Sequence, residues 1–183
     1  MQALVTTFPK PYEDQILALW QDLKEKFGVH YIENTTVPHF TWHICDTYDL
    51  KAVTPLLERI AAEVEPFEIL VEGVGSFISQ APIVYLKIKP NPPLIKLHTR
   101  LWQELLPYSH EPNMLYSPSM WRPHVTLALQ DLSAEQLEPV LAYVREQKIS
   151  WWITIDHYSV LKQTPDGAIS LINHFQFGKG IIF

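Results

Sequence analysis

The sequence predicts an α+β fold of two similar lobes, each with an antiparallel sheet and helices, around an active cleft between the lobes. Segments rich in β-branched and aromatic residues alternate along the chain with segments of helical periodicity. The stretches VPHFTWHI and RPHVTLAL share Pro-His-x-Thr, and helix, strand and strand patterns follow each of them in the same order. We therefore predict a single two-lobed domain over 1–183, with repeated units that start near residues 37 and 122.

The opening part of the chain is expected to form a strand, a helix and a second strand. Residues 3–8, ALVTTF, are rich in strand formers. Residues 11–28 carry apolar side chains at helical spacing and end in Gly28, a residue that favours a helix terminus. The segment HFTWHI at 39–44 is β-branched and aromatic, which indicates a strand.

The middle of the chain is expected to form a helix, two strands and another helix. Residues 49–64 have a helical apolar stripe, and 67–77 and 82–88 have the composition of strands. A further helical pattern at 92–108 opens with proline, which helices tolerate in their first turn.

The last part of the chain repeats this series. Residues 124–129 resemble a strand, and 133–147 a helix with Ser133 as its N-cap. Two more strands are expected at 151–163 and 167–178.

The spacing of the two copies supports an internal repeat. His39 and His124 are 85 residues apart, and Val84 in a later strand is separated from Ile169 by the same number. The two units are expected to be joined through residues 92–120.

The alternation of side chains along a strand predicts which motif residues share a face. His39 and Thr41 should project from one face of their strand, and His124 and Thr126 from one face of theirs, with the apolar residues between them in the core. Two such faces would place both imidazoles in one cleft. Near neutral pH one histidine can act as a base and the other as an acid, while threonine hydroxyls can bind phosphate oxygens.

Paired His-x-Thr motifs in a duplicated α+β chain resemble the 2H phosphoesterase superfamily, which includes 2′-5′ RNA ligase-like and cyclic phosphodiesterase branches. The resemblance implies a bilobal fold and metal-independent attack on a cyclic phosphate or a related phosphodiester. It also implies that His39 and His124 are catalytic and that Thr41 and Thr126 bind phosphate. Some ligase-like members carry an arginine five residues after the second histidine, where this chain has Leu129.

Strand alternation suggests four further substrate contacts. Tyr85 and Lys87 should face away from the core and toward the cleft, where Tyr85 could stack on a base and Lys87 could attract an anion. His43 has the same parity as the first motif, and Arg122 lies two residues before His124. The alternative is that Tyr85 and Lys87 are exposed sheet residues and that His43 is structural, while Pro123 disturbs the strand next to Arg122.

A metal site is the main alternative for the histidines. His39 and His43, with His124 or His30, would supply three imidazoles. Residues four apart on a strand are roughly 13 Å distant, which is too far to share one zinc ion without a bend. Cys45 has no cysteine partner and is interpreted as a strand-end residue. We therefore expect no metal and no cofactor.

Composition limits the partners and the location. The net charge of −6 disfavours binding to duplex DNA along its backbone. A single cysteine, no signal-peptide pattern and no long apolar run predict a cytoplasmic protein without membrane contact. We expect a monomer that hydrolyses 2′,3′-cyclic phosphates on nucleotides or RNA ends. The alternatives are 2′-5′ RNA ligase activity and a non-catalytic nucleotide-binding module.

Overall fold

The computed structural model describes all residues except 31, 33–34, 36, 165–168 and 179–183. The helices are α1 (Tyr12–Phe27), α2 (Leu50–Ala62), α3 (Pro92–Leu105) and α4 (Ala134–Glu146). The strands are β1 (Gln2–Thr7), β2 (His39–Cys45), β3 (Thr47–Tyr48), β4 (Phe67–Phe77), β5 (Ile83–Lys89), β6 (Ser109–His110), β7 (His124–Ala128), β8 (Ser150–Ile155), β9 (His157–Gln163) and β10 (Ile169–Gln176). Two 3₁₀ turns, Leu106–Tyr108 and Met114–Tyr116, follow α3.

Each helix and strand expected from the sequence forms within a few residues of its predicted limits. The predicted strand 151–163 is interrupted at Asp156, which separates β8 from β9. Residues 167 and 168, where the last strand was expected to begin, lie outside the described residues.

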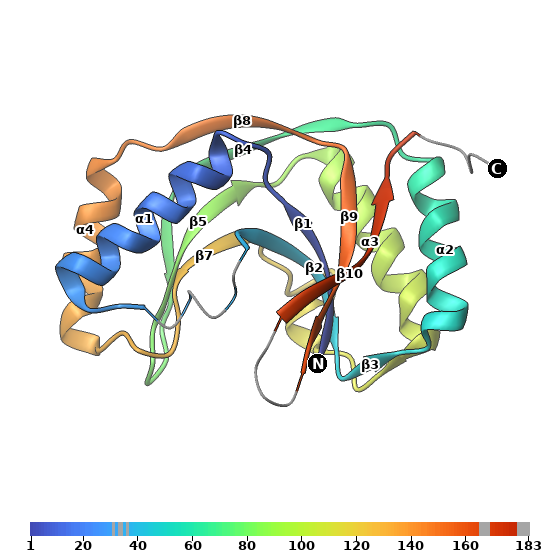
Figure 1. Ribbon diagram of the computed structural model, residues 1–183, viewed down its shortest axis with the longest axis horizontal. Coiled ribbons are helices and arrows are strands. Elements are labelled where there is room, and N and C mark those ends of the chain that lie inside the picture. Colours follow the sequence, from blue (N-terminus) through green and yellow to red (C-terminus); the bar gives the residue numbers. More distant parts are fainter. Residues whose placement is uncertain (31, 33–34, 36, 165–168, 179–183) are drawn as a thin grey trace.

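Eight strands form one antiparallel sheet in the order β10-β9-β1-β2-β7-β5-β4-β8. Its middle is narrow, because β2 and β7 are joined only through the residue pair Phe40 and Val125 in the described part of the chain. We call β10, β9, β1 and β2 the His39 half, and β7, β5, β4 and β8 the His124 half. Helices α2 and α3 pack on the His39 half and α1 and α4 on the His124 half (Figure 1). The predicted α+β, two-lobed antiparallel fold is confirmed.

The two halves do not coincide with consecutive stretches of the chain. After β2 and α2, the chain crosses to the His124 half as β4 and β5, which pair with β8 and β7. After β7 and α4, it runs through β8 and returns to the His39 half as β9 and β10. Strands β4 and β5, which follow the first Pro-His-x-Thr motif, thus lie in the half that holds the second motif, and the last two strands lie in the half that holds the first. The repeat in the sequence does not reveal this exchange.

Local signals fix the ends of the helices. Ser133 accepts a hydrogen bond from the main-chain N–H of Gln136, whose side chain accepts one from the N–H of Ser133 in return, so α4 begins with a capping box. Asn91 caps α3 through the N–H of Leu94. Gly28 ends α1 with a φ of 73°, a left-handed conformation that glycine adopts without steric cost.

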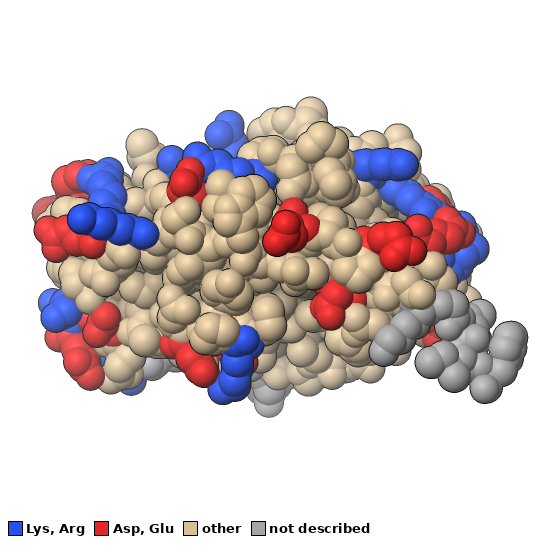
Figure 2. Space-filling model, turned by 90° about the horizontal axis from the view of Figure 1, so that it is seen from above, with Lys and Arg blue, Asp and Glu red and all other residues tan. Residues whose placement is uncertain are grey.

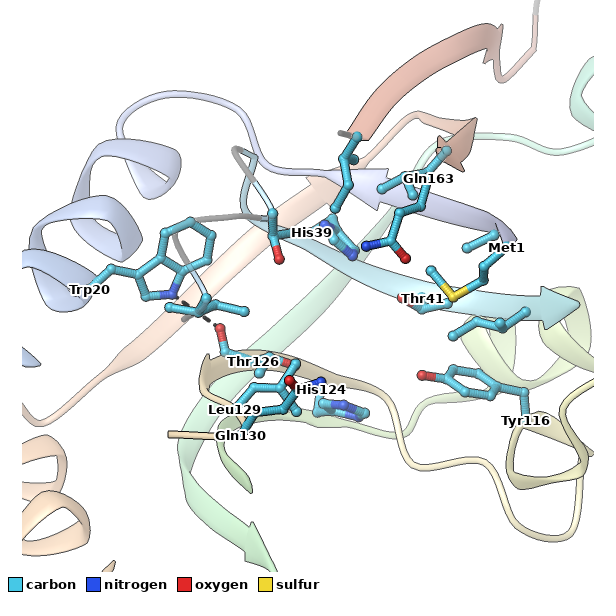
Figure 3. Close-up of a pocket in the computed structure, with 16 residues that line it drawn as sticks. Met1, Trp20, His39, Thr41, Tyr116, His124, Thr126, Leu129, Gln130 and Gln163 are labelled. Atoms are coloured by element: carbon cyan, nitrogen blue, oxygen red, sulfur yellow. Dashed lines mark hydrogen bonds between the residues drawn. The ribbon is translucent and has the colours of Figure 1, made fainter. Parts of the chain in front are cut away.

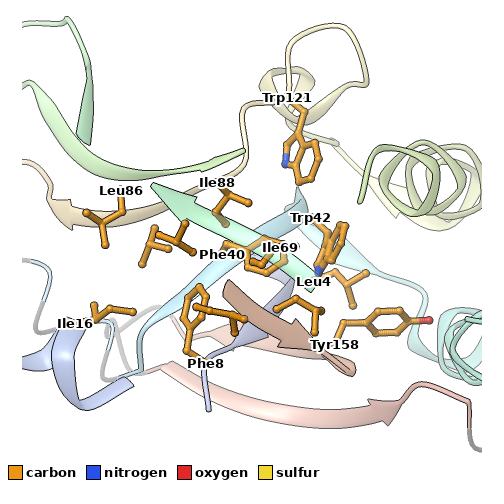
Figure 4. Packing of buried hydrophobic residues seen from close by; sticks show 14 of the residues in the cluster. Leu4, Phe8, Ile16, Phe40, Trp42, Ile69, Leu86, Ile88, Trp121 and Tyr158 are labelled. Carbon is orange, nitrogen blue, oxygen red and sulfur yellow. The ribbon is translucent and has the colours of Figure 1, made fainter. Parts of the chain in front are cut away.

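The main core lies between the helices and the sheet (Figure 4). Phe40 and Trp42 of β2 are completely buried, and their rings are 4.8 Å apart. The indole N–H of Trp42 donates to Thr6 Oγ1 at 2.8 Å, and the Tyr158 hydroxyl donates to the carbonyl of Leu57 at 2.6 Å. These polar atoms are buried with partners, which avoids the cost of an unsatisfied donor. The residues between the motif histidine and threonine thus anchor β2 in the core.

Charge is distributed in small groups over the face of the molecule that Figure 2 shows. Among the described residues on the face shown in Figure 2, Lys and Arg side chains are interrupted by Asp, Glu and uncharged residues. That face therefore lacks a continuous basic track of the kind that follows a nucleic-acid backbone. None of the described helices is both long and apolar enough to cross a membrane.

Candidate active site

The two Pro-His-x-Thr motifs meet at the junction of the two halves of the sheet. Because Phe40 of β2 pairs with Val125 of β7 in an antiparallel ladder, the flanking histidines and threonines project together from the opposite face. His39, Thr41, His124 and Thr126 line one pocket of about 320 Å³ (Figure 3). The structure thus brings the four residues of the predicted catalytic and phosphate-binding set together.

Both imidazoles are oriented by the same kind of hydrogen bond. Nδ1 of His39 lies 2.9 Å from the carbonyl oxygen of Val37, and Nδ1 of His124 lies 2.6 Å from that of Arg122. A carbonyl oxygen only accepts, so in both rings Nδ1 carries the hydrogen. Nε2 is then the nitrogen of each ring that can contact a bound molecule. It accepts a hydrogen bond when the ring is neutral and donates one when the ring is charged.

The pocket shifts both histidines toward their neutral forms. Burial is the largest cause and lowers the pKa of His39, while the hydrogen bond to Val37 raises it and the nearby His124 lowers it. Burial also lowers the pKa of His124, against the raising effect of its bond to Arg122. The mutual electrostatic effect means that a second proton on the pair is disfavoured once one is bound.

Two tryptophans hold the main chain of the motif threonines. The indole N–H of Trp121 donates to the carbonyl of Thr41 at 2.9 Å, and that of Trp20 donates to the carbonyl of Thr126 at 3.1 Å. Each tryptophan comes from a segment outside the strand that it holds. No local pattern in the sequence predicts these contacts, because each depends on how distant segments pack together.

Tyr116 is a further pocket residue that the sequence did not identify. Its hydroxyl points into the pocket near Thr41 (Figure 3). Burial raises the pKa of this hydroxyl, while a hydrogen bond with Thr41 lowers it. The tyrosine lies in the 3₁₀ turn of the proline-rich connection, a segment whose position over the sheet no local pattern predicts.

Tyr85 and Lys87 lie on the same sheet face as the second motif, as strand alternation predicts. Tyr85 of β5 pairs with Thr126, and Lys87 pairs with His124. The Tyr85 ring is 5.0 Å from the His124 ring and 4.4 Å from the ring of Phe77, so it is packed rather than open, with 8% of its surface exposed. Lys87 is exposed. Both flank the pocket, and neither lines it directly.

The expectation that His43 shares a face with the first motif is wrong. The pairing of β1 with β2 is irregular at this point: Leu4 pairs with His43, but the next residue, Val5, pairs with Thr41. Trp42 is therefore an extra residue in β2, which is a β-bulge. This bulge turns His43 into the core, where it is completely buried and its Nδ1 lies 2.7 Å from the Tyr48 hydroxyl. It therefore cannot contact a substrate in the pocket.

Arg122 also departs from expectation, because β7 begins only at His124 and does not extend to it. Its side chain is exposed and is not part of the pocket lining, and its contribution to the site is the carbonyl that orients His124. The metal alternative needed His39 and His43 around one ion. The bulge directs these two side chains to opposite faces of the sheet.

Comparisons with known proteins agree with this architecture. A curated relative from Geobacillus kaustophilus (strain HTA426), named "Putative phosphoesterase GK0864", is 28% identical over 158 residues, covering 85% of this chain and 86% of the relative. A "Putative phosphoesterase" from Bacillus pumilus (strain SAFR-032) is 27% identical over 164 residues, covering 87% of this chain and 91% of the relative.

Two solved structures share the fold over nearly the whole chain. TT0787 of Thermus thermophilus superimposes with a TM-score of 0.61 at 14% identity, over 97% of each chain. E. coli LigT, solved in complex with 3′-AMP, superimposes with a TM-score of 0.59 at 13% identity, over 97% of this chain and 98% of LigT. Residues 12–167 match the sequence model of the family described as "2'-5' RNA ligase superfamily". With two His-x-Thr motifs facing one pocket, the chain belongs to the 2′-5′ RNA ligase superfamily of 2H phosphoesterases.

Proposed function

We propose that this protein is a phosphoesterase that hydrolyses 2′,3′-cyclic phosphates or related RNA phosphodiesters with two histidines as acid and base and without a metal ion. The observation that carries the proposal is the pair of imidazoles in one pocket, each with Nδ1 bound to a carbonyl and Nε2 left to exchange protons. Neutral Nε2 of one histidine removes a proton from water, whose oxygen attacks phosphorus. Charged Nε2 of the other gives a proton to the departing ribose oxygen as its bond to phosphorus breaks.

The threonine hydroxyls are suited to hold the non-bridging phosphate oxygens. Thr41 and Thr126 are neutral donors, and they line the same pocket as the histidines. As negative charge grows on the phosphorus oxygens in the transition state, donors held in place by the sheet stabilise it. The indole contacts of Trp121 and Trp20 keep the two strands in position for this role.

The composition of the pocket favours a substrate with a single negative charge. None of the described lining residues is Lys, Arg, Asp or Glu. A phosphodiester or cyclic phosphate carries one charge, which one imidazolium can balance, whereas a triphosphate carries several. The partly exposed ring of Phe77, 5.1 Å from the ring of His124, offers aromatic surface for a nucleobase. The 3′-AMP bound to the structural neighbour LigT supports a nucleotide as the substrate class.

The reverse reaction, joining of RNA ends through a 2′-5′ bond, needs the same four residues with a ribose hydroxyl in place of water. The superfamily match keeps this direction open as the second candidate. A nucleotide-binding module without turnover would use the pocket but form no product.

The test is a panel of nucleoside 2′,3′-cyclic phosphates and RNA ends followed by phosphorus NMR after exhaustive treatment with a chelator. We expect conversion of a cyclic phosphate to a monoester, undiminished by the chelator, and none with the double variant His39→Gln, His124→Gln. Activity that disappears with the chelator and returns only with a divalent ion contradicts the metal-free mechanism. Tight nucleotide binding with no product from any substrate favours the binding module, and joined RNA ends favour the ligase.

A further inference from the structure

A second group of hydrogen-bonding side chains lies on the cleft face of the His39 half. Thr7 of β1 pairs with His39 of β2, so its side chain projects next to the candidate catalytic imidazole on the same face. Beyond it, His157 Nε2 of β9 lies 2.9 Å from Thr7 Oγ1. The row continues to β10, where Gln176 pairs with His157.

The register shows that this row faces the cleft and not the core. Ala3 and Leu161, which line the pocket, have the same parity in β1 and β9 as Thr7 and His157. The irregularity between β1 and β2 lies between Leu4 and Val5, so it leaves the pairing of Thr7 with His39 undisturbed. Farther along the same face the side chains become apolar, with Ala3 packed against Leu161. The polar group is thus confined to the end of the cleft next to His39.

His157 is held by partners on both ring nitrogens. Its Nδ1 lies 2.8 Å from Asp156 Oδ1, on the edge of the ring opposite Thr7. Burial raises the pKa of the Asp156 carboxyl, but hydrogen bonds from His157 and Gln176 outweigh this effect and lower it, so Asp156 is a carboxylate. The side chain of His157 is 14% exposed. The ring is therefore fixed in orientation and still partly accessible to solvent.

His174 completes the group from β10. Its ring centre is 4.7 Å from that of His157, and its Nδ1 lies 3.2 Å from Ser159 Oγ. The side chain is exposed, unlike that of His157. Two neighbouring imidazoles and a threonine hydroxyl on one sheet face together supply several hydrogen-bonding groups that could contact a ligand.

We infer that Thr7, His157 and His174 form a second phosphate subsite, which binds the next phosphodiester of an RNA end whose terminal cyclic phosphate lies between His39 and His124. This inference rests on the proposed function. When Nε2 of His157 carries a hydrogen, it donates to Thr7 Oγ1, which leaves the Thr7 hydroxyl hydrogen free for a phosphate oxygen. His174 Nε2, which lies 3.4 Å from Gln176 Oε1, supplies a second donor when a phosphate oxygen replaces that long contact. His157 on β9 lies two strand spacings from His39 on β2, roughly 10 Å, a distance that one further nucleotide can span.

The test compares a mononucleotide 2′,3′-cyclic phosphate with a dinucleotide that ends in the same cyclic phosphate. We expect kcat/KM of the wild type to be about tenfold higher for the dinucleotide, the effect of one charge-assisted contact. In Thr7→Val, His157→Gln and His174→Ala this ratio should fall toward one. A dinucleotide with an uncharged methylphosphonate linkage should lose the advantage in the wild type, which separates a phosphate contact from contacts to the sugar or base.

His110→Ala is the matched control. His110 lies on β6, outside the pocket, and like His157 it has a carboxylate near Nδ1, that of Asp46 at 3.8 Å. This variant should leave the ratio unchanged. Equal kcat/KM for both substrates in the wild type, or variants that slow both equally, would overturn the subsite.

A second measurement keeps the subsite testable if no cyclic phosphate is turned over, which is the outcome that overturns the proposed function. In NMR titrations with a dinucleotide 3′-monophosphate, the ring signals of His157 and His174 should shift, and they should not shift with the mononucleotide. Unchanged ring signals with both ligands would contradict the second subsite independently of catalysis.

Discussion

Each imidazole of the candidate pair is oriented by a main-chain carbonyl two residues before it. The bonds of His39 to Val37 and of His124 to Arg122 give both rings the same tautomer, with Nε2 free. Neither ring needs a carboxylate partner for its orientation. In the proposed mechanism, the acid and base roles depend on which ring holds the proton, a property of the pair and not of either residue alone.

Replacing His39 or His124 by alanine should lower kcat by about 10²–10⁴-fold, the usual contribution of a positioned acid or base. The double variant should not multiply the two losses, because the residues act as a unit. Steady-state hydrolysis of a cyclic phosphate, with circular dichroism as a check of folding, measures this. Folded single variants with wild-type turnover would exclude the two-histidine mechanism.

Two other histidines affect stability instead of catalysis. Burial lowers the pKa of both His43 and His98 to about 4, with nearby His98 lowering that of His43 further. Hydrogen bonds to main-chain carbonyls only partly oppose burial at His98. In the unfolded chain a histidine titrates near 6.5, so between these values the unfolded state binds more protons. The contribution of these two histidines to the free energy of unfolding should be fully present above about pH 6.5 and should decrease as the pH falls toward 4.

The expected loss is about 3 kcal/mol for each of these two buried histidines, from about 1.4 kcal/mol for each pKa unit. Urea denaturation between pH 4 and 8 measures it. His43→Leu should reduce the loss of stability between pH 8 and pH 4 by about 3 kcal/mol, the share of His43 itself, and His110→Ala is the exposed control. A free energy of unfolding that stays constant from pH 8 to pH 4.5 would contradict this explanation.

At the scale of elements, β2 and the β4–β5 hairpin shape the two sides of the cleft. The bulge at Trp42 lets β2 present His39 and Thr41 to the pocket while Trp42 and His43 both enter the core. On the other side, Gly75 of β4 pairs with Tyr85 of β5. A side chain at Gly75 has no room, because a Cβ atom there would lie 2.8 Å from ring carbons of Tyr85.

Gly75→Ala should therefore displace the Tyr85 ring, which contacts His124, and lower kcat by up to about 10²-fold, the cost of a misplacement of about 1 Å. Cyclic-phosphate hydrolysis measures the loss. In the double variant Gly75→Ala, Tyr85→Leu the added methyl group no longer meets the Tyr85 ring and displaces only the flexible end of the Lys87 side chain, so the two losses should not add. Additive losses would show that the glycine acts independently of Tyr85.

Periodicity and composition predicted the helices and strands, because each leaves a local pattern of apolar side chains. They also predicted the cleft face of His39, Thr41, His124 and Thr126, since strict alternation holds over three residues. The same rule failed at His43, because one extra residue in β2 reverses the parity and leaves no mark in the sequence. Trp20 and Tyr116 were not identified because their places in the pocket depend on tertiary packing.

At the scale of the whole molecule, the two halves are interdependent. Residues 1–91 contain β1, β2, β4 and β5, whose neighbours β9, β7 and β8 all come from the second part of the chain. The candidate catalytic pair itself consists of one histidine from each part. Neither part can thus complete a half of the sheet.

Fragments 1–91 and 92–183 should each lack a cooperative thermal transition when alone and regain one when mixed, because mixing restores the missing strand neighbours. Circular dichroism melts of each fragment, the mixture and the intact chain measure this. A sharp transition for fragment 1–91 alone, at a temperature close to that of the intact chain, would show that the exchanged strands contribute little to the stability of the fold.

The exchange of strands also determines when the site can form during synthesis on the ribosome. His39 is made early, but the strand that β1 needs on its other side, β9, begins only at His157. A nascent chain that has just exposed His124 still lacks β8, β9 and β10 and has unpaired edges at β1 and β4. Such edges can pair with other chains. The growing chain therefore passes most of its synthesis with an incomplete sheet, and the cleft becomes rigid only when its last strands emerge.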